Sequence, residues 1–553
     1  MNHDILLGAE AVARGAIDAG ISGAYAYPGT PSTEIFETIL ELDRKDDLHL
    51  HAHWSANEKV AMEEALGMSY AGRRALVSFK HVGLNVAADP FLNSALTGAH
   101  GGLVVAVADD PSMHSSQNEQ DSRFYADFAN IPCLEPSSQQ QAYDMTIEAF
   151  EVSERLKMPV MLRLTTRLAH SRSVITPRPR RPQNEAKFPD QSWKWTLLPS
   201  NARMAFDELL VHQVDFQAWS QAHPANQLTL TGQGRPGIVA SGIAIGYVKA
   251  ALGEKLKDYN LLHICVYPLP EQSLRELTQA SSAVYVFEEG YPLIERLLVG
   301  VGRAAPVAVH GRLSGLVPRA GELNADKVKR AFGLPPAVKV QVPAAVAEVL
   351  QSRAPVLCDG CPHTDSYRFL NEVMAEHPGS RVMGDIGCYT LGYYPPHNAI
   401  QSCVCMGASI GMASGVVHAG LWPVVCVLGD STFTHSGLPP LLDAINEDTD
   451  MTVMILDNSI VAMTGGQETM IGETEKIVGL VKGLGANPDH VHVLSPLPKA
   501  HEHNVALLRQ EVAHRGLSVI VASRACVTYA KQIKENRRHH GLPGMVANLE
   551  GKP

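Results

Sequence analysis

Two apolar segments in the last third of the chain end in small polar residues, and this pattern restricts the fold more than any other feature. The run VVCVL is followed by Gly429, Asp430 and Ser431, and the run MTVMIL is followed by Asp457 and Asn458. We predict that both runs are buried strands with their polar residues at the carboxyl ends. In an open α/β sheet, that edge is where ligands bind. The chain is therefore predicted to contain an α/β sheet with a polar ligand site at one edge.

The residue types at this edge can hold a diphosphate and a magnesium ion. A helix that begins there offers free backbone N–H groups to a diphosphate. Asp430 and Asn458 can supply hard oxygen ligands to Mg²⁺, which is bound by few protein groups together with substrate phosphates. The order of the residues matches the thiamine-diphosphate motif, in which GD(G/S) is followed, after the next strand, by (N/D)N. Two unrelated Asx turns at strand ends are the alternative interpretation.

A second candidate, Glu58, lies far from this motif in the sequence. It opens a helical segment, NEKVAMEEALGMSYAG, after the alternating run HLHAHW. Thiamine enzymes need a carboxylate facing N1′ of the aminopyrimidine, because it favours the imino tautomer that deprotonates C2 of the thiazolium. A glutamate in the first turn of a helix is otherwise a partner of the helix dipole. Only together with the Asp430 motif does Glu58 indicate catalysis.

Strand-like and helix-like segments alternate along most of the chain. In residues 4–170, apolar runs such as RALVSF and GGLVVAVAD alternate with amphipathic segments such as 140–156, which predicts a parallel sheet covered by helices. The Pro- and Arg-rich segment 171–193 is typical of a surface linker. Two further α/β blocks follow. The predicted fold class is α/β, and the predicted segments are 1–175, a linker at 176–196, 197–345, 346–530 and a polar tail at 531–553.

Composition excludes several classes of function. The 553 residues carry a formal net charge of −11, so no basic field is available for a nucleic acid. The start, MNHDILLGAE, lacks a basic n-region with an apolar h-region, and the nine Cys are an odd number. We therefore expect a cytoplasmic protein without a disulfide framework. The uncharged stretch 403–428 is long enough to span a membrane, but its glycines, His418 and Pro423 favour a small-residue helix followed by a buried strand, so no span is predicted.

Several strings resemble one family, in the same order along the chain. They are YPGTPSTEI, NEKVAMEEALG, KHVGLNVAADP, ADDPSMHSSQNEQDSRFYA, CDGCPH, GDIGCYTLG, CMGASIGMA and GDSTFTHSG. The sequence is similar to the large (alpha) subunit of indolepyruvate ferredoxin oxidoreductase, within the 2-oxoacid:ferredoxin oxidoreductases. The resemblance implies a thiamine-diphosphate-binding fold with two doubly wound parallel-sheet domains, of the pyrimidine and diphosphate types. Between them it implies a middle α/β domain similar to the C-terminal domain of transketolase.

The resemblance also implies roles for individual residues. Glu58 would activate the aminopyrimidine, and Thr30 would contact the substrate carboxylate. Asp430, Asn458 and the backbone carbonyl of Ile460 would hold Mg²⁺. Further residues would lie near the thiazolium, the diphosphate or the substrate, with the two histidines as candidates for catalysis: His81, Asn85, Gly387, Met406, Gly429, Ser431 and His435. Without the family, Thr30 is an ordinary turn residue, a lone histidine is structural, and the methionine fills core space.

Four cysteines form a second predicted metal site. Cys358 and Cys361 make a C-x-x-C pair and are followed by Cys388 and Cys526. Related oxidoreductases bind a proximal [4Fe-4S] cluster through Cys at corresponding places, and four thiolates are what such a cluster needs. A zinc site that includes His363 and a set of plain buried thiols are the alternatives. The other cysteines lie in apolar runs and are expected to be small core residues: Cys133, Cys265, Cys403, Cys405 and Cys426.

The expected function follows from the resemblance. The chain would decarboxylate a 2-oxoacid of the arylpyruvate type, such as indolepyruvate, and oxidise the product to an acyl-CoA, with electrons leaving through the cluster to ferredoxin or another acceptor. Large subunits of this family usually end in a ferredoxin-like domain, but no Cys follows Cys526, so that domain is expected to be missing. A small (gamma or beta) subunit is the expected partner in a heteromer. The alternatives are a non-oxidative decarboxylase or carboligase, and a scaffold subunit.

Overall fold

The chain folds into two compact units, Met1–Val340 and Gln341–Pro553. The computed structural model describes most residues of both, namely 3–187, 193–299, 307–337 and 356–539. The predicted boundary between residues 345 and 346, part of the predicted linker and the end of the predicted tail lie outside the described residues. The predicted segment boundaries stay predictions.

The first unit contains a seven-stranded sheet of order β12-β6-β7-β5-β4-β2-β3. Neighbouring strands are parallel except β12 and β6, which are antiparallel. The runs RALVSF and GGLVVAVAD contain β4 and β5, and every residue of these strands and of β7 is buried, as expected for parallel strands covered on both faces. The bounds are β2 Gly23–Ala26, β3 His51–Trp54, β4 Ala75–Lys80, β5 Leu103–Asp109, β6 Cys133–Leu134, β7 Val160–Thr165 and β12 Val266–Tyr267.

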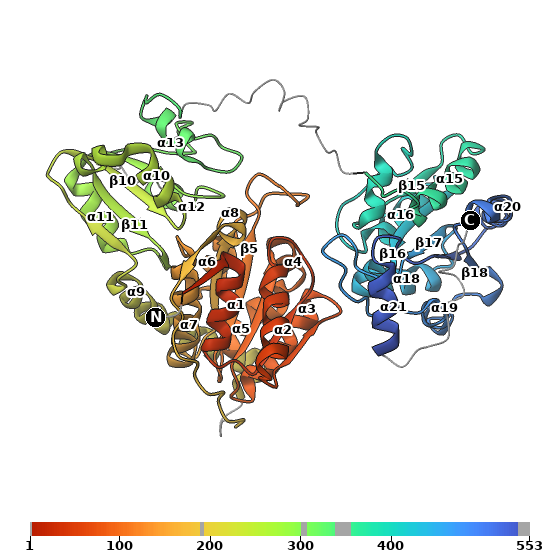
Figure 1. The fold of residues 1–553 in the computed structure, drawn as a ribbon, viewed down its shortest axis with the longest axis horizontal. Coiled ribbons are helices and arrows are strands. Elements are labelled where there is room, and N and C mark those ends of the chain that lie inside the picture. The colour runs from red at the N-terminus through yellow and green to blue at the C-terminus, as the bar shows by residue number, and fades with distance from the viewer. Residues whose placement is uncertain (1–2, 188–192, 300–306, 338–355, 540–553) are drawn as a thin grey trace. The chain divides into compact units, whose positions relative to one another are not determined.

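Helices connect these strands and pack on the sheet (Figure 1). Helix α3 begins at Glu58, as predicted, because the Asn57 side chain caps it and accepts a 2.9 Å hydrogen bond from the N–H of Val60. Helix α7 confirms the segment predicted at 140–156. The bounds are α1 Gly8–Asp18, α2 Thr33–Asp46, α3 Glu58–Tyr70, α4 His81–Val86, α5 Ala88–Thr97, α6 Arg123–Ala129, α7 Gln139–Leu156 and α8 Thr166–His170.

The same unit contains a five-stranded sheet of order β14-β13-β10-β11-β9 and a two-stranded pair of β1 (Asp4–Leu7) with β8 (Arg172–Ile175). Strand β12 follows β11 in the chain but pairs with β6 of the seven-stranded sheet. The chain that forms the five-stranded sheet therefore also contributes one strand to the seven-stranded sheet. The remaining bounds are α9 Pro199–Ala222, β9 Gln227–Thr229, β10 Arg235–Ser241, α10 Ala244–Leu252, β11 Asn260–Ile264, α11 Glu271–Ala280, β13 Ser281–Phe287, α12 Leu293–Val299, β14 Ala308–His310 and α13 Ala325–Ala331.

The second unit contains one five-stranded parallel sheet of order β15-β16-β17-β19-β18. Helix α21 occupies the start of the segment predicted as a polar tail, and its Ile533 is buried, so one side of this polar helix packs inward. The bounds are α15 Pro362–Ala375, β15 Arg381–Met383, α16 Ala408–His418, β16 Val424–Gly429, α18 Leu438–Asn446, β17 Thr452–Asp457, α19 Thr474–Gly483, β18 Val491–Leu494, α20 His501–Ala513, β19 Ser518–Ser523 and α21 Ala530–His539.

Side chains of β16 alternate between two apolar clusters. Val425 and Val427 belong to one cluster, while Val424, Cys426 and Leu428 belong to the other. Successive side chains of a strand point to opposite faces, so both faces of this sheet are covered, which explains the continuous apolar run. Helix α16 followed by β16 confirms the prediction for the uncharged stretch. Within the part of the chain that the structure describes, no helix is long and apolar enough to cross a membrane.

Candidate active site

The carboxyl ends of β16 and β17 bring the two halves of the Asp430 motif together. The strands are parallel neighbours, and Gly429 pairs with Leu456 in their register. Asp430 therefore lies directly after the end of β16, and Asp457 lies at the end of the adjacent strand β17. Both side chains are buried. The prediction that these polar residues meet at one edge of a parallel sheet is confirmed.

Asp430 is a buried carboxylate that no described residue balances in an ion pair. Its Oδ1 accepts a 2.8 Å hydrogen bond from the N–H of Ser431. Its Oδ2 and the Oγ of Ser431 are buried without a hydrogen-bond partner among the described residues. Burial and the neighbouring charge of Asp457 raise the pKa of Asp430 well above its usual value. Because an unpartnered buried carboxylate oxygen is costly and a divalent cation would compensate it, Asp430 fits the requirements of a Mg²⁺ ligand.

The other two predicted magnesium ligands lie in the turn after β17. The Oδ1 of Asn458 accepts a 3.3 Å hydrogen bond from the N–H of Ile460, and the Asn458 carbonyl accepts one of 3.0 Å from the N–H of Cys526. Ser459 has a φ of 61°, a left-handed conformation that reverses the chain direction. A carboxylate, an amide oxygen and a backbone carbonyl at one strand edge form a donor set that suits Mg²⁺.

Asp457 belongs to the same motif but is held by the protein itself. Its Oδ2 accepts hydrogen bonds from the hydroxyls of Thr474, at 2.7 Å, and Ser523, at 2.9 Å. Its Oδ1 accepts a 3.0 Å bond from the N–H of Ser459. These bonds tie the turn after β17 to β19 and to the start of α19. Asp457 therefore positions the turn that contains Asn458.

An aromatic ring explains two glycines of the predicted cofactor site. A Cβ atom on Gly387 would overlap Cε1 of Tyr389, and a Cβ atom on Gly429 would lie 2.7 Å from the same atom. The Tyr389 hydroxyl donates to the carbonyl of Ile386 at 2.7 Å and lies 2.9 Å from the hydroxyl of Thr432. The two glycines thus leave room for a buried ring that links the loop after β15 to the start of the Asp430 segment. The sequence analysis missed Tyr389, although it lies in the string GDIGCYTLG.

A fully buried carboxylate orders the loop before α16. The two oxygens of Asp385 accept hydrogen bonds from the N–H groups of Gly407 and Ser409, both at 2.9 Å. Gly407 has a φ of 85°, and a Cβ atom there would lie 2.6 Å from the carbonyl of Ser436, so this position requires glycine. Met406 is partly exposed and does not fill a core position. The sequence analysis missed Asp385, whose flanking glycines were the available signal.

In the first unit, Glu58 lies against the first turns of α4. A Cβ atom on Gly83 would be 2.6 Å from Oε1 of Glu58 and 2.8 Å from its Cγ. The absence of a side chain at Gly83 therefore makes room for the carboxylate. Glu58 is 8% exposed, and it lies where β3 gives way to α3. A carboxylate held in this way can present one oxygen in a fixed direction.

The other polar residues predicted at the site have different surroundings. His81 is 1% exposed, its Nε2 lies 3.1 Å from the carbonyl oxygen of Asn118, and its Nδ1 has no hydrogen-bond partner among the described residues. Asn85 is exposed, and its Oδ1 accepts a 2.7 Å hydrogen bond from the Tyr125 hydroxyl. In the second unit, His435 is 4% exposed, with its Nδ1 2.7 Å from the hydroxyl of the next residue. Their roles in catalysis stay predictions.

Two loops and the last residue of a strand meet at the carboxyl ends of β2, β4 and β5, which are neighbours in the sheet. Thr30 lies in the loop after β2, and its carbonyl accepts a 3.1 Å hydrogen bond from the hydroxyl of Ser115, in the loop after β5. The Nζ of Lys80, the last residue of β4, donates to the carbonyl of Ser115 at 2.6 Å. The sequence analysis included Thr30 and missed Lys80. The available signal was a cationic residue at the end of an apolar strand.

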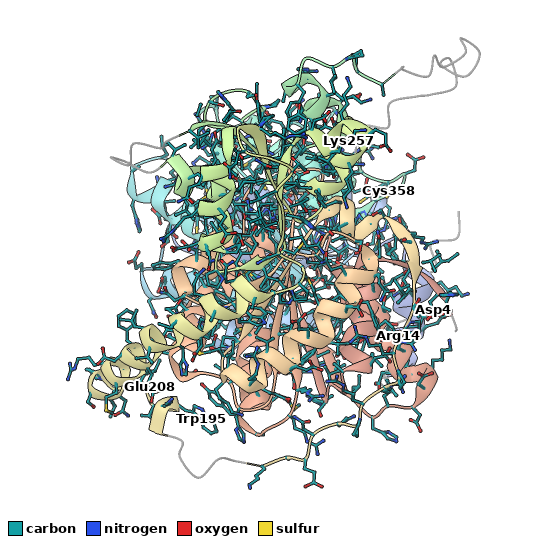
Figure 2. All side chains as sticks on the ribbon, turned by 90° about the vertical axis from the view of Figure 1, so that its left-hand side faces the viewer. Asp4, Arg14, Trp195, Glu208, Lys257 and Cys358 are labelled. Carbon is teal, nitrogen blue, oxygen red and sulfur yellow. The ribbon has the colours of Figure 1, made fainter. Side chains whose placement is uncertain are left out.

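The four predicted cluster cysteines lie close enough to affect one another's ionisation. Burial raises the pKa of Cys388 to about 12, and the charges of Cys361, Cys526 and Cys358 add to this effect. Burial, with contributions from Cys358 and Cys526, also raises the pKa of Cys361. All four are free thiols, and Cys358, labelled in Figure 2, is exposed. Among the described residues, no three or more His, Cys, Asp or Glu are arranged to hold a metal ion, so the cluster stays a prediction.

Two of the remaining cysteines contradict their prediction. Cys403 and Cys405 were expected in the core, but both are exposed. The physical reason is that their apolar run belongs to the irregular loop between β15 and α16 and contributes to neither element. Cys133, Cys265 and Cys426 are buried, which confirms the prediction for them.

Two family models match the chain, one in each unit. Residues 14–231 match the family described as "Pyruvate flavodoxin/ferredoxin oxidoreductase, thiamine diP-bdg". Residues 385–521 match "Thiamine pyrophosphate enzyme, C-terminal TPP binding domain". The first match includes Glu58, and the second includes Asp430 and Asn458. Together with the parallel sheets, these matches define an α/β thiamine-diphosphate enzyme of the 2-oxoacid oxidoreductase class.

Comparison with curated relatives shows which family within this class the chain belongs to. The indolepyruvate oxidoreductase subunit IorA of Archaeoglobus fulgidus is 37% identical over 94% of this chain and 86% of that protein. The subunits of the same name from Methanothermobacter marburgensis and Thermococcus kodakarensis are 36% and 35% identical, over 94% and 95% of this chain and 86% of each relative. The chain therefore belongs to the indolepyruvate oxidoreductase subunit IorA family and is an oxidoreductase subunit. This confirms the resemblance found in the sequence.

One solved structure is a more distant match. The 2-oxoglutarate:ferredoxin oxidoreductase from Magnetococcus marinus aligns with a TM-score of 0.49 and 15% identity over 60% of this chain and 65% of that chain. This similarity is too low to inform the site. The predicted site residues therefore stay predictions.

Proposed function

We propose that this chain is the thiamine-diphosphate-binding subunit of an enzyme that oxidatively decarboxylates an arylpyruvate-type 2-oxoacid to the acyl-CoA. The observation that carries the proposal is the buried, unpartnered Oδ2 of Asp430 at the shared edge of β16 and β17. A scaffold subunit has no reason to retain such a costly group. The preference for an arylpyruvate, such as indolepyruvate, is supported by the name of the relatives.

Each unit contains residues that would bind one part of the cofactor. Asp430, Asn458 and the carbonyl of Ile460 would hold Mg²⁺, which in turn binds the diphosphate. Glu58 would hold a proton at N1′ of the aminopyrimidine, and its burial beside Gly83 keeps that carboxylate in one direction and excludes water. When bound, thiamine diphosphate supplies the electron sink for cleavage of the bond to the substrate carboxylate.

The electron path would begin at the four thiols of the second unit. Cys358, Cys361, Cys388 and Cys526 match the ligand complement of a [4Fe-4S] cluster, and their mutual effects on pKa support a common site. Electrons would then pass to ferredoxin or another acceptor, and CoA would take up the acyl group. A small subunit would complete the enzyme as a heteromer, and the predicted location is the cytoplasm.

Metal and cofactor analysis of protein purified without oxygen tests this proposal. We expect bound thiamine diphosphate together with about four iron and four sulfide per chain. The Cys361→Ser variant should lose most of its iron, whereas the matched Cys403→Ser variant, in an exposed thiol outside the predicted quartet, should retain it. The complex with the small subunit should reduce a viologen dye only when an arylpyruvate and CoA are both present.

Two outcomes would contradict parts of the proposal. Thiamine diphosphate without iron would contradict the redox step and favour a non-oxidative decarboxylase or carboligase. Absence of thiamine diphosphate binding in the presence of Mg²⁺ would contradict the cofactor site itself and favour a scaffold subunit.

A further inference from the structure

The lysine at the end of β4 carries a charge that no described residue neutralises in an ion pair. Lys80 is 9% exposed, and its ammonium donates to the carbonyl of Ser115 at 2.6 Å and lies 3.5 Å from the hydroxyl of the same residue. Among the residues that the structure describes, Lys80 takes part in no ion pair. Buried ammonium groups are almost always paired. The exception at Lys80 therefore points to an anion that comes from outside the chain.

The surroundings of Lys80 place it beside the residue expected to contact the substrate. A Cβ atom on Gly29 would lie 3.2 Å from Cβ of Lys80, so the lysine stem packs on the turn that precedes Thr30. Ser115, which accepts the hydrogen bond from the ammonium, donates its own hydroxyl to the carbonyl of Thr30 at 3.1 Å. His81, the next residue, begins α4 and is itself buried. The ammonium thus belongs to the loop cluster that contains Thr30.

The charged group that acts on Lys80 is Asp110, in the loop after β5. Its carboxylate is already engaged by the hydroxyls of Ser116, at 2.5 Å, and Thr166, at 2.7 Å, and by the N–H of Ser115, at 2.8 Å. Burial outweighs the attraction of Asp110 and lowers the pKa of Lys80 to about 8. The negative charge of Asp110 thus partly stabilises the buried ammonium, although the two groups form no ion pair.

We propose that Lys80 is a specificity-determining residue that pairs with the carboxylate of the 2-oxoacid substrate, an inference that rests on the proposed function. An ammonium has three donors, of which the carbonyl of Ser115 accepts one at 2.6 Å and its hydroxyl a second, longer one at 3.5 Å. The third donor can form a charge-assisted hydrogen bond to a carboxylate. The pairing involves no covalent step, and it gives both buried charges a partner.

Substitution of Lys80 in the complex with the small subunit tests the proposal. In Lys80→Gln, the KM for an arylpyruvate should rise about tenfold to a hundredfold, as expected for loss of a charged hydrogen bond. The methyl ester of the same arylpyruvate, which lacks the negative charge, should inhibit the variant and the wild type equally. Lys80→Arg, which keeps the charge, should recover part of the affinity. Lys157→Gln is the matched control, because the Lys157 ammonium lies on an exposed surface, where it donates to the carbonyl of His100 at 3.5 Å.

The pH dependence supplies a readout that a purely structural lysine would not affect. In the wild type, the KM should stay constant below about pH 8 and rise above it, because the ammonium then loses its proton. In Lys80→Arg this rise should be absent in the same range, because a guanidinium does not titrate there.

Several results would overturn the inference. An unchanged KM in Lys80→Gln would do so. So would a higher KM for CoA or weaker thiamine-diphosphate binding, since either would assign the lysine to a phosphate. Equal losses for the acid and its ester would show a structural role only. If wild-type protein does not turn over any arylpyruvate, the proposed function fails instead. Calorimetric titration of the arylpyruvate into wild type and Lys80→Gln then tests the role of Lys80 in binding separately from turnover. Equal binding in both proteins, or binding in neither, would refute that role.

Discussion

The largest buried charges of the first unit are paired with one another, whereas Asp430, at a strand end of the second unit, has an oxygen without a partner among the described residues. Arg163 and Arg123 are both 1% exposed or less. Arg163 pairs with Asp109 at 2.6 Å, and Arg123 pairs with Asp121 at 2.5 Å and with Glu288 at 3.1 Å. Glu288 follows β13 of the five-stranded sheet, whereas Arg163 and Asp109 belong to strands of the seven-stranded sheet. This network therefore fastens the two sheets of the first unit together.

Asp430 is the opposite case. It is as deeply buried as the carboxylates of that network, but its Oδ2 has no partner among the described residues. Lys80 is the corresponding exception in the first unit, and it also lies at the carboxyl end of a strand. The difference teaches that a buried charge paired with its neighbours holds the fold together, whereas a buried charge without a partner at a strand end is reserved for a ligand.

Breaking the network should cause the largest effect. Arg163→Met should destabilise the first unit by about 3–5 kcal/mol, because it leaves Asp109 and Glu135 buried without this cation. Urea denaturation followed by circular dichroism measures the loss. Arg178→Ala is the control, since its pair with Asp144 is exposed and should contribute less than about 1 kcal/mol. Equal shifts in both variants would refute the distinction between paired buried charges and surface pairs.

Neutralising Asp430 should affect binding and not folding. Asp430→Asn should weaken thiamine-diphosphate binding in the presence of Mg²⁺ by about a hundredfold, or roughly 2.7 kcal/mol. Without ligands, the variant should be at least as stable as the wild type, because an uncompensated buried charge is removed. Calorimetric titration and thermal unfolding measure the two effects, with the exposed Asp443→Asn as the control. A ligand-free variant as unstable as Arg163→Met would show that Asp430 is a structural charge.

The position of Asp430 at a strand end could be predicted because it depends on residues that are close together in the sequence. Two apolar runs that end in GDS and DN must place those residues at one edge if the runs are parallel neighbours, and β16 and β17 are. The start of α3 at Glu58 was predictable for the same reason, since strand and helix patterns change at that point.

The paired charges could not be predicted, because their partners are distant in the chain. Arg163 and Asp109 are separated by 54 positions, and the carbonyl of Glu289 that Arg123 binds is 166 positions away. No periodic pattern connects such residues. The prediction for Cys403 was wrong for another reason. Apolar neighbours in the sequence do not distinguish a loop from a core strand.

The smallest expected effect, measured per unit of pH, comes from Glu289, a buried carboxylate of the first unit. Burial raises the pKa of Glu289 from 4.5 to about 7, although the N–H of Leu323 and the charge of Arg312 oppose this shift. The folded protein therefore keeps a proton that the unfolded chain releases between about pH 4.5 and 7. The stability that this proton contributes is fully present below pH 4.5 and is lost as the pH rises toward 7.

Glu289→Gln is uncharged at every pH and should remove this part of the pH dependence. Between pH 4.5 and 7, the variant should lose less stability than the wild type, by at most about 1.4 kcal/mol per pH unit. Urea denaturation at several pH values measures the difference, and the exposed Glu254→Gln serves as the control. If the curves for Glu289→Gln and wild type run parallel, Glu289 is ionised throughout this range and is balanced by Arg312. The network would then contain only fully paired charges, which would make its contrast with Asp430 complete.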